Sequence, residues 1–341
     1  MKYPELSLEM ARKVCDGRGL SDREIQYLID WPEEEYFDLL PGANLIRRHF
    51  WGNGIHLCAI SNGKSGRCPE DCAFCAQSIH FSTNAPVYGL KPTDELVKDA
   101  EVYVGTPVNR FSIVASGRRV SSRTIDRVAE TYGKLGSSQL SYCASLGVAD
   151  EDDLRRLKAA GVSRYHHNLE TARSHFPNIC TTHTYDERVE TIEAAKRVGL
   201  QVCSGGIFGM GETDAQVAEL ALELKRLRVD SVPVNFLVPV EGTPMAGAQS
   251  ITPQRCLKVT AMLRFILGGP EILIGGGRAD NLKHLHSLVF MAGASGTLTG
   301  NYLTRTGEQL DRDLAMLTEL GLAPRGETEV PVGRHPQPTV D

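Results

Sequence analysis

The chain has 341 residues, of which 41% are hydrophobic, and its formal net charge at pH 7 is -5. Such a chain can bury a large core, and its acidic balance does not favour binding to nucleic acid. Neither a signal peptide nor an apolar run of about 18 residues is visible, so we expect no membrane insertion. The nine cysteines then indicate a reducing, cytoplasmic compartment in which thiols serve metal or redox chemistry.

The expected elements alternate between short β-rich runs and helical stretches, after a helical N-terminal cap over residues 1–45. Eight strands are expected, at residues 55–61, 110–115, 139–144, 164–168, 201–207, 231–237, 271–275 and 296–300. Eight helices are expected at residues 93–104, 121–135, 150–160, 185–198, 214–227, 252–267, 281–292 and 310–320. This alternation predicts an α/β fold, a parallel (β/α)8 TIM-type barrel over residues 46–322. The proline-containing tail, residues 323–341, is expected to be poorly ordered.

Three cysteines, Cys68, Cys72 and Cys75, lie in the loop that follows the first expected strand. Thiolates with this spacing can hold three irons of a [4Fe-4S] cluster and leave the fourth iron without a protein ligand. A closed zinc site would need a fourth ligand, and only His80 is near, while an odd number of cysteines disfavours a disulfide framework. The triplet therefore predicts a [4Fe-4S] cluster with an open iron.

The positions of other cysteines connect them with the same end of the barrel, because active sites of this fold lie at the carboxyl ends of the strands. Cys143 lies near the end of the third expected strand, and Cys203 lies within the fifth. If both point inward they could bind a second cluster, although most free cysteines are small buried side chains. Cys58 in the first strand and Cys180 after the fourth are weaker candidates.

Five segments, taken together, resemble the biotin synthase family of the radical S-adenosylmethionine superfamily. They are the triplet loop (62–78), YHHNLE (165–170), TTHTYDER (181–188), CSGGIFGMGET (203–213) and SVPVN (231–235). The resemblance implies that the triplet cluster binds the amine and carboxylate of S-adenosylmethionine, whose one-electron cleavage gives a 5'-deoxyadenosyl radical. It also implies conversion of dethiobiotin to biotin by hydrogen abstraction, with insertion of sulfur from an auxiliary iron-sulfur cluster.

The resemblance also assigns residues to S-adenosylmethionine. Gly205, Ile207, Gly209 and Glu212 match the fifth-strand pattern that lines the adenosine, although alone they would indicate a glycine-rich turn between strand and helix. Arg188 is likened to the arginine that holds the carboxylate, a role suited to a guanidinium group. Without the resemblance it would be interpreted as a solvated charge on a helix.

Polar residues at the carboxyl ends of the fourth and sixth strands are likened to contacts of ribose and substrate. Asn168 and Glu170 can bind ribose hydroxyls and a ureido group, and the family often has the shorter Asp at the second position. Asn235 is likened to a ureido contact of dethiobiotin. The pair His166 and His167 could suggest a metal, but we expect one imidazole to face the core and the other a helix.

Two positions depart from the family pattern at the auxiliary cluster, which is usually a [2Fe-2S] cluster held by three cysteines and an arginine. Ser112 stands at the second-strand cysteine and Leu273 at the seventh-strand arginine. The two cysteines that remain are too few for such a cluster. The type of auxiliary cluster is therefore open, and the spare cysteines in the first strand and after the fourth could complete it.

Two alternatives stay open at this point. A related radical enzyme could change a carbon skeleton or mature a metallocofactor without inserting sulfur, and the loss of two usual ligands favours it. A non-catalytic iron-sulfur scaffold is the alternative from another class, and cleavage of S-adenosylmethionine would distinguish it from both enzymes. A one-electron donor such as flavodoxin or ferredoxin is expected as a partner, and a homodimer is expected as the assembly.

Overall fold

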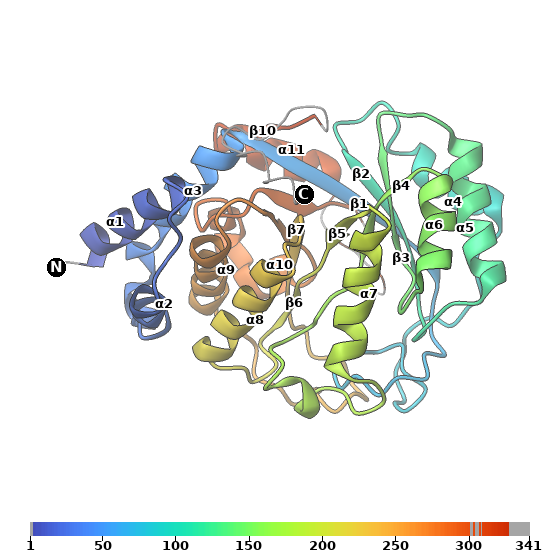
Figure 1. Cartoon of the computed structure of the whole chain (residues 1–341), viewed down its shortest axis with the longest axis horizontal. Helices are drawn as coiled ribbons and strands as arrows, with labels where there is room; N and C mark the ends of the chain where they lie inside the picture. Colours follow the sequence, from blue (N-terminus) through green and yellow to red (C-terminus); the bar gives the residue numbers. More distant parts are fainter. Residues whose placement is uncertain (1–2, 301–302, 304–306, 308, 327–341) are drawn as a thin grey trace.

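Parallel strands form a closed barrel in the computed structural model, which describes residues 3–300, 303, 307 and 309–326 (Figure 1). The strands are β1 Gly54–Lys64, β2 Arg110–Ala115, β3 Ser141–Ser145, β4 Val162–His166, β5 Gln201–Cys203, β6 Gly206–Phe208, β7 Ser231–Phe236, β8 Glu271–Ile274 and β9 Gly296–Leu298. β5 and β6 are two segments of one barrel strand and both pair with β7. β9 pairs with β1 and closes the ring. The predicted TIM-type barrel of eight parallel strands is confirmed.

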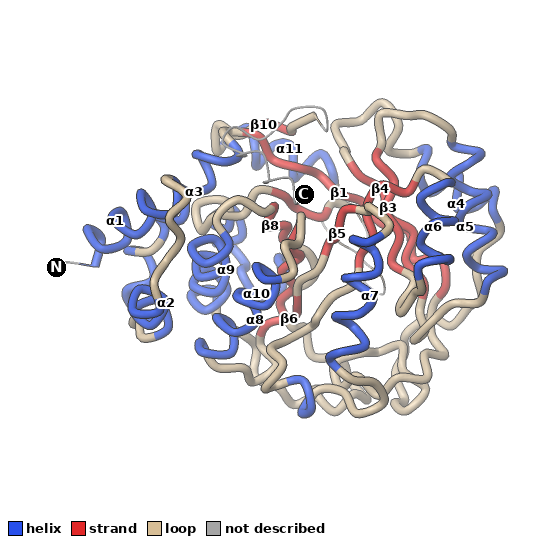
Figure 2. Tube along the Cα trace, in the orientation of Figure 1, coloured by secondary structure: helices blue, strands red, loops and turns tan. Residues whose placement is uncertain are grey.

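Helices cover the outside of the barrel, as the blue segments around the red strands show (Figure 2). They are α4 Thr93–Glu101, α5 Ser122–Leu135, α6 Glu151–Ala159, α7 Tyr185–Arg197, α8 Asp214–Arg226, α9 Pro253–Leu267 and α11 Leu310–Glu319. In five of them the side chain of the residue just before the helix accepts the backbone N–H three residues later, which stabilises the helix start: Ser121, Asp150, Thr184, Thr213 and Thr252.

One expected helix, at residues 281–292, differs in the structure. A short α-helix, α10 (Arg278–Leu282), is followed by a 3-10 helix, η3 (Lys283–Val289). Lys283 has a φ of 50°, a left-handed value that an α-helix cannot contain. The segment therefore changes direction at Lys283 instead of continuing as one helix.

The N-terminal residues form helices that pack at one end of the molecule, beside α8 and α9 (Figure 1). These are α1 Tyr3–Cys15, α2 Asp22–Ile29, the 3-10 helix η1 Glu33–Asp38 and α3 Leu40–Trp51. Lys258 of α9 connects them to the barrel helices, because its ammonium group donates to the carbonyl of Trp31 and lies 2.7 Å from the carboxylate of Asp214. The expected boundary at residue 45 falls inside α3.

The chain beyond α11 returns to the barrel. Ala323–Pro324 forms β10, which pairs in parallel with Gly54 and Ile55 of β1. Arg325 is buried and donates to the carbonyl of Trp51. Residues 323–326 of the expected tail are thus held by the free backbone groups at the start of β1. The remainder of the expected tail, residues 327–341, lies outside the described residues.

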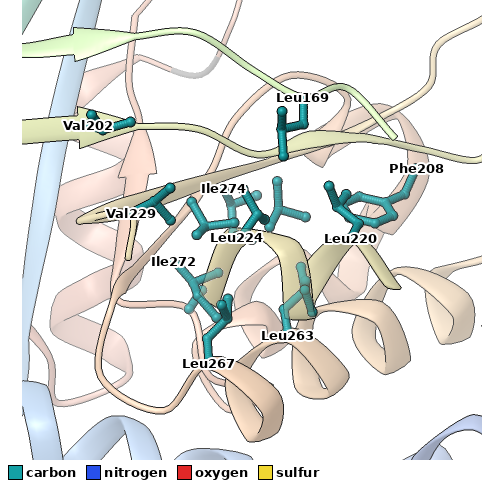
Figure 3. Packing of buried hydrophobic residues seen from close by; sticks show 14 of the residues in the cluster. Leu169, Val202, Phe208, Leu220, Leu224, Val229, Leu263, Leu267, Ile272 and Ile274 are labelled. Atoms are coloured by element: carbon teal, nitrogen blue, oxygen red, sulfur yellow. The ribbon is translucent and has the colours of Figure 1, made fainter. Parts of the chain in front are cut away.

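The main hydrophobic core lies between the strands and the surrounding helices. Figure 3 shows part of it, where side chains of α8 and α9 meet those of β5, β6, β8 and neighbouring loops: Leu169, Val202, Phe208, Leu220, Leu224, Val229, Leu263, Leu267, Ile272 and Ile274. Alternate residues of each strand point outward into this core, and the others point into the barrel. TIM barrels usually fill the inside with branched apolar side chains, whereas several inward positions here are polar or carry sulfur.

A buried ion pair joins α10 to α11. A guanidinium nitrogen of Arg278 lies 2.5 Å from a carboxylate oxygen of Asp313, and the two side chains are 0% and 1% exposed. Because removal of one partner leaves a buried charge without compensation, we expect Asp313→Ala to lower the free energy of unfolding by about 3–5 kcal/mol. Urea unfolding of wild type and variant measures the difference.

The matched control is Asp16→Ala, which breaks the exposed pair of Asp16 with Arg18. Water and salt screen this pair, so its loss should cost less than about 1 kcal/mol. Similar losses in the two variants would contradict a stabilising role that depends on burial.

Candidate active site

A cavity of about 480 Å³ opens at the carboxyl ends of the strands and extends into the barrel. All eight barrel strands, or the loops that follow them, contribute residues to its wall. The cavity size is in the usual range for a site that holds small molecules. Because TIM barrels carry their active sites at this end, the cavity is the candidate active site.

The cysteine triplet lines the mouth of this cavity, in the loop between β1 and α4. Backbone hydrogen bonds close the loop, since the N–H of Cys75 donates to the carbonyl of Cys72 and the N–H of Cys68 donates to that of Gln77. Burial raises the pKa of Cys75 to about 11 and also raises the pKa of Cys68. These thiols are protonated at neutral pH without a metal, so metal binding must release protons. Three sulfur donors on one loop fit a [4Fe-4S] cluster with one open iron.

Arg188, Asn168 and Glu170 meet at the cavity wall. Arg188 lies in the first turn of α7, where the sequence alone favoured a solvated position, yet it is 9% exposed. Its Nη1 donates to the carbonyl of Asn168 at 2.8 Å and lies 3.6 Å from Oε1 of Glu170. The structure thus brings together a guanidinium, an amide and a carboxylate, a combination that suits an amino-acid head group.

Glu170 occupies a conformation that is rare for residues other than glycine, with a φ of 70°. Its backbone carbonyl accepts the N–H of Ile207, and its side chain accepts from Nδ2 of Asn168 at 3.3 Å. Burial raises the pKa of Glu170. The strained backbone directs this carboxylate toward the cavity, which its side chain lines.

Of the four residues of the fifth-strand pattern, one lines the cavity and three shape the backbone. Ile207 lines the cavity. A Cβ atom on Gly205 would lie 2.0 Å from the carbonyl oxygen of Pro233, so only glycine permits this close approach of strands. Glu212 accepts the backbone N–H groups of Gly209 and Met210 at 2.9 and 2.8 Å. In this structure, Gly205, Gly209 and Glu212 hold the turn in place and do not line the cavity.

Asn235 points into the cavity from β7. Its Oδ1 accepts the N–H of Gly276 at 2.8 Å, and its Nδ2 donates to the carbonyl of Gly206 at 3.3 Å. These two bonds fix the orientation of the amide. One amide hydrogen and one oxygen lone pair are left for a ligand.

Three further cysteines line the deeper part of the cavity. Cys58 lies on β1, Cys143 on β3 and Cys203 at the end of β5. Burial, and then the proximity of the other two cysteines, raises the pKa of Cys58 well above its usual value. Burial raises the pKa of Cys203 to about 12. The prediction that Cys143 and Cys203 face the same cavity agrees with this geometry, and Cys58 joins them.

Cys180 does not join this group. It follows the 3-10 helix η2 (Phe176–Asn178), and its sulfur lies 3.7 Å from the sulfur of Cys72. The N–H of Ala73 donates to the carbonyl of Ile179, which holds this segment against the triplet loop. A hydrogen bond from Cys72 lowers the pKa of Cys180 to about 4. The expectation that Cys180 could complete the auxiliary site is therefore corrected.

Charged residues inside the barrel were not predicted from the sequence. Arg110 lies two residues before Ser112 on β2, and its Nη1 lies 3.7 Å from the sulfur of Cys143. Arg164 of β4 and Glu271 of β8 form an ion pair of 2.6 Å, with side chains 7% and 1% exposed. The two-residue strand period could have identified Arg110, because Ser112 was already placed inside the barrel.

Comparison with known proteins identifies two matching family models. Residues 64–224 match the radical SAM superfamily, and residues 233–323 match the biotin and thiamin synthesis associated domain. Within the described residues, the structure has no helix with the length and apolar character needed to cross a bilayer.

Curated relatives share about half of the residues over nearly the whole chain. The biotin synthase of Desulfatibacillum aliphaticivorans is 51% identical over 94% of this chain and 98% of its own length. That of Geobacter sulfurreducens is 48% identical over 95% of this chain and 98% of its own length. Among solved structures, methylornithine synthase has a TM-score of 0.81 at 20% identity, with 93% of this chain and 97% of that chain covered. The last likeness concerns the fold alone.

His167 gives this site a predicted pH dependence. It follows β4, lines the cavity and is 7% exposed, and burial together with the charge of Arg188 lowers its pKa well below the usual value. The unfolded chain therefore binds a proton more readily, so the free energy of unfolding should fall as the pH drops below about 6.5. One such group contributes at most about 1.4 kcal/mol per pH unit. In His167→Gln, urea unfolding at pH values from about 7 to 5 should show a shallower decline.

The exposed His49 supplies the control. His49→Gln also replaces an imidazole by an amide but at an exposed position, and its slope of the free energy of unfolding against pH is the reference for His167→Gln. Parallel slopes for wild type and His167→Gln would exclude His167 as the source.

Proposed function

The chain belongs to the biotin synthase family, and on that premise we propose which of its residues serve the conversion of dethiobiotin to biotin. The family is that of sulfur-inserting radical S-adenosylmethionine enzymes with a [4Fe-4S] cluster and an auxiliary iron-sulfur cluster. One observation carries the proposal: two separate groups of three cysteines line a single cavity, one at its mouth and one in its depth. A substrate between them would meet the source of a radical on one side and the source of sulfur on the other.

Cys68, Cys72 and Cys75 are proposed to hold the [4Fe-4S] cluster at the cavity mouth. When bound there with S-adenosylmethionine, the cluster supplies the electron that generates a 5'-deoxyadenosyl radical. Arg188 would bind the carboxylate of S-adenosylmethionine as a charged donor, and Glu170 would accept from its amine or its ribose. The burial of Arg188 supports this assignment. Its guanidinium has few anionic neighbours, so N–H donors remain for a ligand.

Three residues of the fifth-strand pattern are proposed to act on S-adenosylmethionine only through the backbone that they shape. Gly205, Gly209 and Glu212 hold the turn that presents Ile207 to the cavity. Ile207 would then pack against the adenine as an apolar surface. The hydrogen bonds of Glu212 to two backbone N–H groups support this indirect role.

Asn235 and Asn168 are proposed to bind the ureido group of dethiobiotin. The backbone holds the oxygen of each amide: Oδ1 of Asn235 accepts from Gly276, and Oδ1 of Asn168 accepts from Gly205. Such fixed amides offer a donor and an acceptor to a ureido group without having to reorient. Apolar neighbours on the wall, including Ile60 and Val114, would exclude water from the reacting carbon atoms.

The auxiliary cluster is proposed to be held by Cys58, Cys143 and Cys203. Cys58 supplies the third sulfur that Ser112 no longer provides, and Leu273 contributes only an apolar surface. Three thiolates in a buried space need positive charge nearby, and Arg110 and Arg164 supply it. This donor set fits a cluster with three protein ligands, which would release sulfide to the substrate.

A one-electron donor such as flavodoxin or ferredoxin is proposed as the partner, because each cleavage of S-adenosylmethionine consumes one electron. The nine cysteines are all free thiols, which supports a reducing, cytoplasmic location. A homodimer is proposed as the assembly on the family resemblance alone.

The triplet assignment is tested by Cys68→Ala and Cys75→Ala. Loss of one of three ligands should remove the [4Fe-4S] cluster and abolish formation of 5'-deoxyadenosine, while the barrel stays folded because the loop is separate from the strands and helices that form it. Iron content, circular dichroism and product analysis measure the three effects. Cys15→Ala, at a half-buried position of α1 far from the cavity lining, should retain the product. Full product formation in either triplet variant would refute the assignment.

The auxiliary assignment predicts that the two products separate. In Cys58→Ala and in Cys203→Ala, biotin formation should stop while 5'-deoxyadenosine formation continues, because the radical cluster lies on a different loop. Both products are measured in one reaction, along with the iron bound per chain. Equal loss of both products, or retention of biotin formation, would show that these cysteines do not hold the sulfur source.

A further inference from the structure

A second group of potential metal ligands lies behind the triplet loop. It consists of Cys72, Cys180 and His183, whose ligand atoms all lie within 4.8 Å of one another. The side chains come from two segments that are 108 positions apart, and their exposures are only 8%, 4% and 8%. Cys180 does not line the active-site cavity, so this group is distinct from the auxiliary cysteines.

The distances in this group match the edges of a metal coordination tetrahedron. With a Zn–S bond of about 2.3 Å and a Zn–N bond of about 2.0–2.1 Å, tetrahedral angles place two sulfurs about 3.8 Å apart and a sulfur and a nitrogen about 3.6 Å apart. The sulfurs of Cys72 and Cys180 are 3.7 Å apart. The sulfur of Cys180 lies 3.3 Å from Nδ1 and 3.9 Å from Nε2 of His183. The ligand atoms of these side chains therefore already lie near the separations that a single bound ion requires.

A carboxylate supports the histidine in the manner of a metal site. Nδ1 of His183 is hydrogen-bonded to Glu70, which leaves Nε2 as the ligand atom. Metal-binding histidines usually donate their other ring N–H to a carboxylate or carbonyl, which fixes the ring. Nε of Arg188 donates to Nε2 of His183 at 2.9 Å, so Arg188 must move aside when the ion binds.

An oxygen donor is available for the fourth position. Oδ1 of Asp71 lies 3.2 Å from the sulfur of Cys180. The backbone N–H groups of Thr181 and Thr182 donate to the same oxygen at 2.9 and 3.2 Å, and they hold the carboxylate in place. Two thiolates, an imidazole and an oxygen form a donor set that suits Zn²⁺.

We propose that the cluster-free chain binds one divalent transition-metal ion, best fitted by Zn²⁺, at Cys72, Cys180 and His183. Both sulfurs bind as thiolates: Cys72 releases its proton to solvent, Cys180 releases any proton that it still carries, and both Zn–S bonds form with the electron pairs of the sulfurs without any redox change. Because Cys72 cannot bind both metals, the ion and the [4Fe-4S] cluster exclude each other. The binding of the ion stands on this geometry alone, whereas the exclusion rests on the proposed role of Cys72 in the cluster.

The site is tested on the full chain, freed of clusters and kept reduced without oxygen. Co²⁺ serves as the visible probe and Zn²⁺ as its competitor. Wild type should show thiolate-to-cobalt absorption that Zn²⁺ removes. Cys180→Ala and His183→Gln should each lower the affinity at least about tenfold, and Glu70→Gln should lower it about 10–100-fold, as expected for the partner of a ligating histidine. Cys256→Ala, at a buried position within α9, should bind as wild type does.

A triplet variant separates this site from the cluster loop. Cys75→Ala should still bind Co²⁺ with wild-type affinity, because Cys75 is not part of the group. Equal loss in Cys75→Ala and Cys180→Ala, or wild-type binding in Cys180→Ala, would overturn the site.

Competition between the two metals is tested by reconstitution with iron and sulfide. One equivalent of Zn²⁺ added beforehand should slow formation of the [4Fe-4S] cluster in wild type but not in Cys180→Ala. If Zn²⁺ binds as expected and cluster formation is unchanged, the exclusion is wrong and the ion site stands. If the triplet variants keep forming 5'-deoxyadenosine, the proposed function fails instead, with no effect on Co²⁺ binding by Cys180.

Discussion

One buried carboxylate, that of Glu271, compensates positive charge inside the barrel. Its two oxygens accept from Arg164 at 2.6 Å and from Nδ1 of His56 at 3.0 Å. Burial by itself would raise the pKa of Glu271, but Arg164 and His56 lower it well below the usual value. The carboxylate therefore stays charged and compensates an arginine at the level of the inner cysteines. A polar interior of this kind is what allows the barrel to contain chemistry where most barrels contain only packed aliphatic side chains.

On each strand, the outward side chains stabilise the barrel and the inward side chains line the cavity. On β2, Phe111 and Ile113 point outward and are fully buried against the helices, while Arg110 and Ser112 point inward and line the cavity. The same alternation repeats on the neighbouring strands, so the outer core can hold the barrel closed without contributions from its interior. An inward side chain can therefore be replaced with little loss of packing in the outer core. Ser112 and Leu273, the two positions at which we infer a departure from the family pattern, are both inward positions of this kind, and Cys58 lies on β1 beside β2.

Arg188 contacts residues of two proposed sites at the cavity mouth, the S-adenosylmethionine site and the mononuclear ion site. One side of its guanidinium faces Asn168 and Glu170, and its Nε donates to His183, the proposed ligand of the mononuclear ion. An ion on His183 would displace Arg188 from its present position. Occupation of the mononuclear site would then disturb the group that is proposed to hold the carboxylate of S-adenosylmethionine. Cluster assembly and cofactor binding would in this way respond to the same ion, through Cys72 on one side and Arg188 on the other.

The amino-acid sequence by itself determined the barrel and the triplet, because both depend on local patterns. Strand and helix periodicity specify the alternation of elements, and Cys68 and Cys75 lie close enough along one loop to share a cluster whatever surrounds them. Only the tertiary structure decided that Cys58 joins the inner group and Cys180 does not, since barrel closure brings β1 beside β9 and turns η2 toward the triplet loop. The burial of Arg188 and the strained backbone of Glu170 likewise arise from contacts between residues far apart in the chain. Spacing along a sequence carries no information on such contacts, because strand phase and barrel closure set the side on which each residue lies.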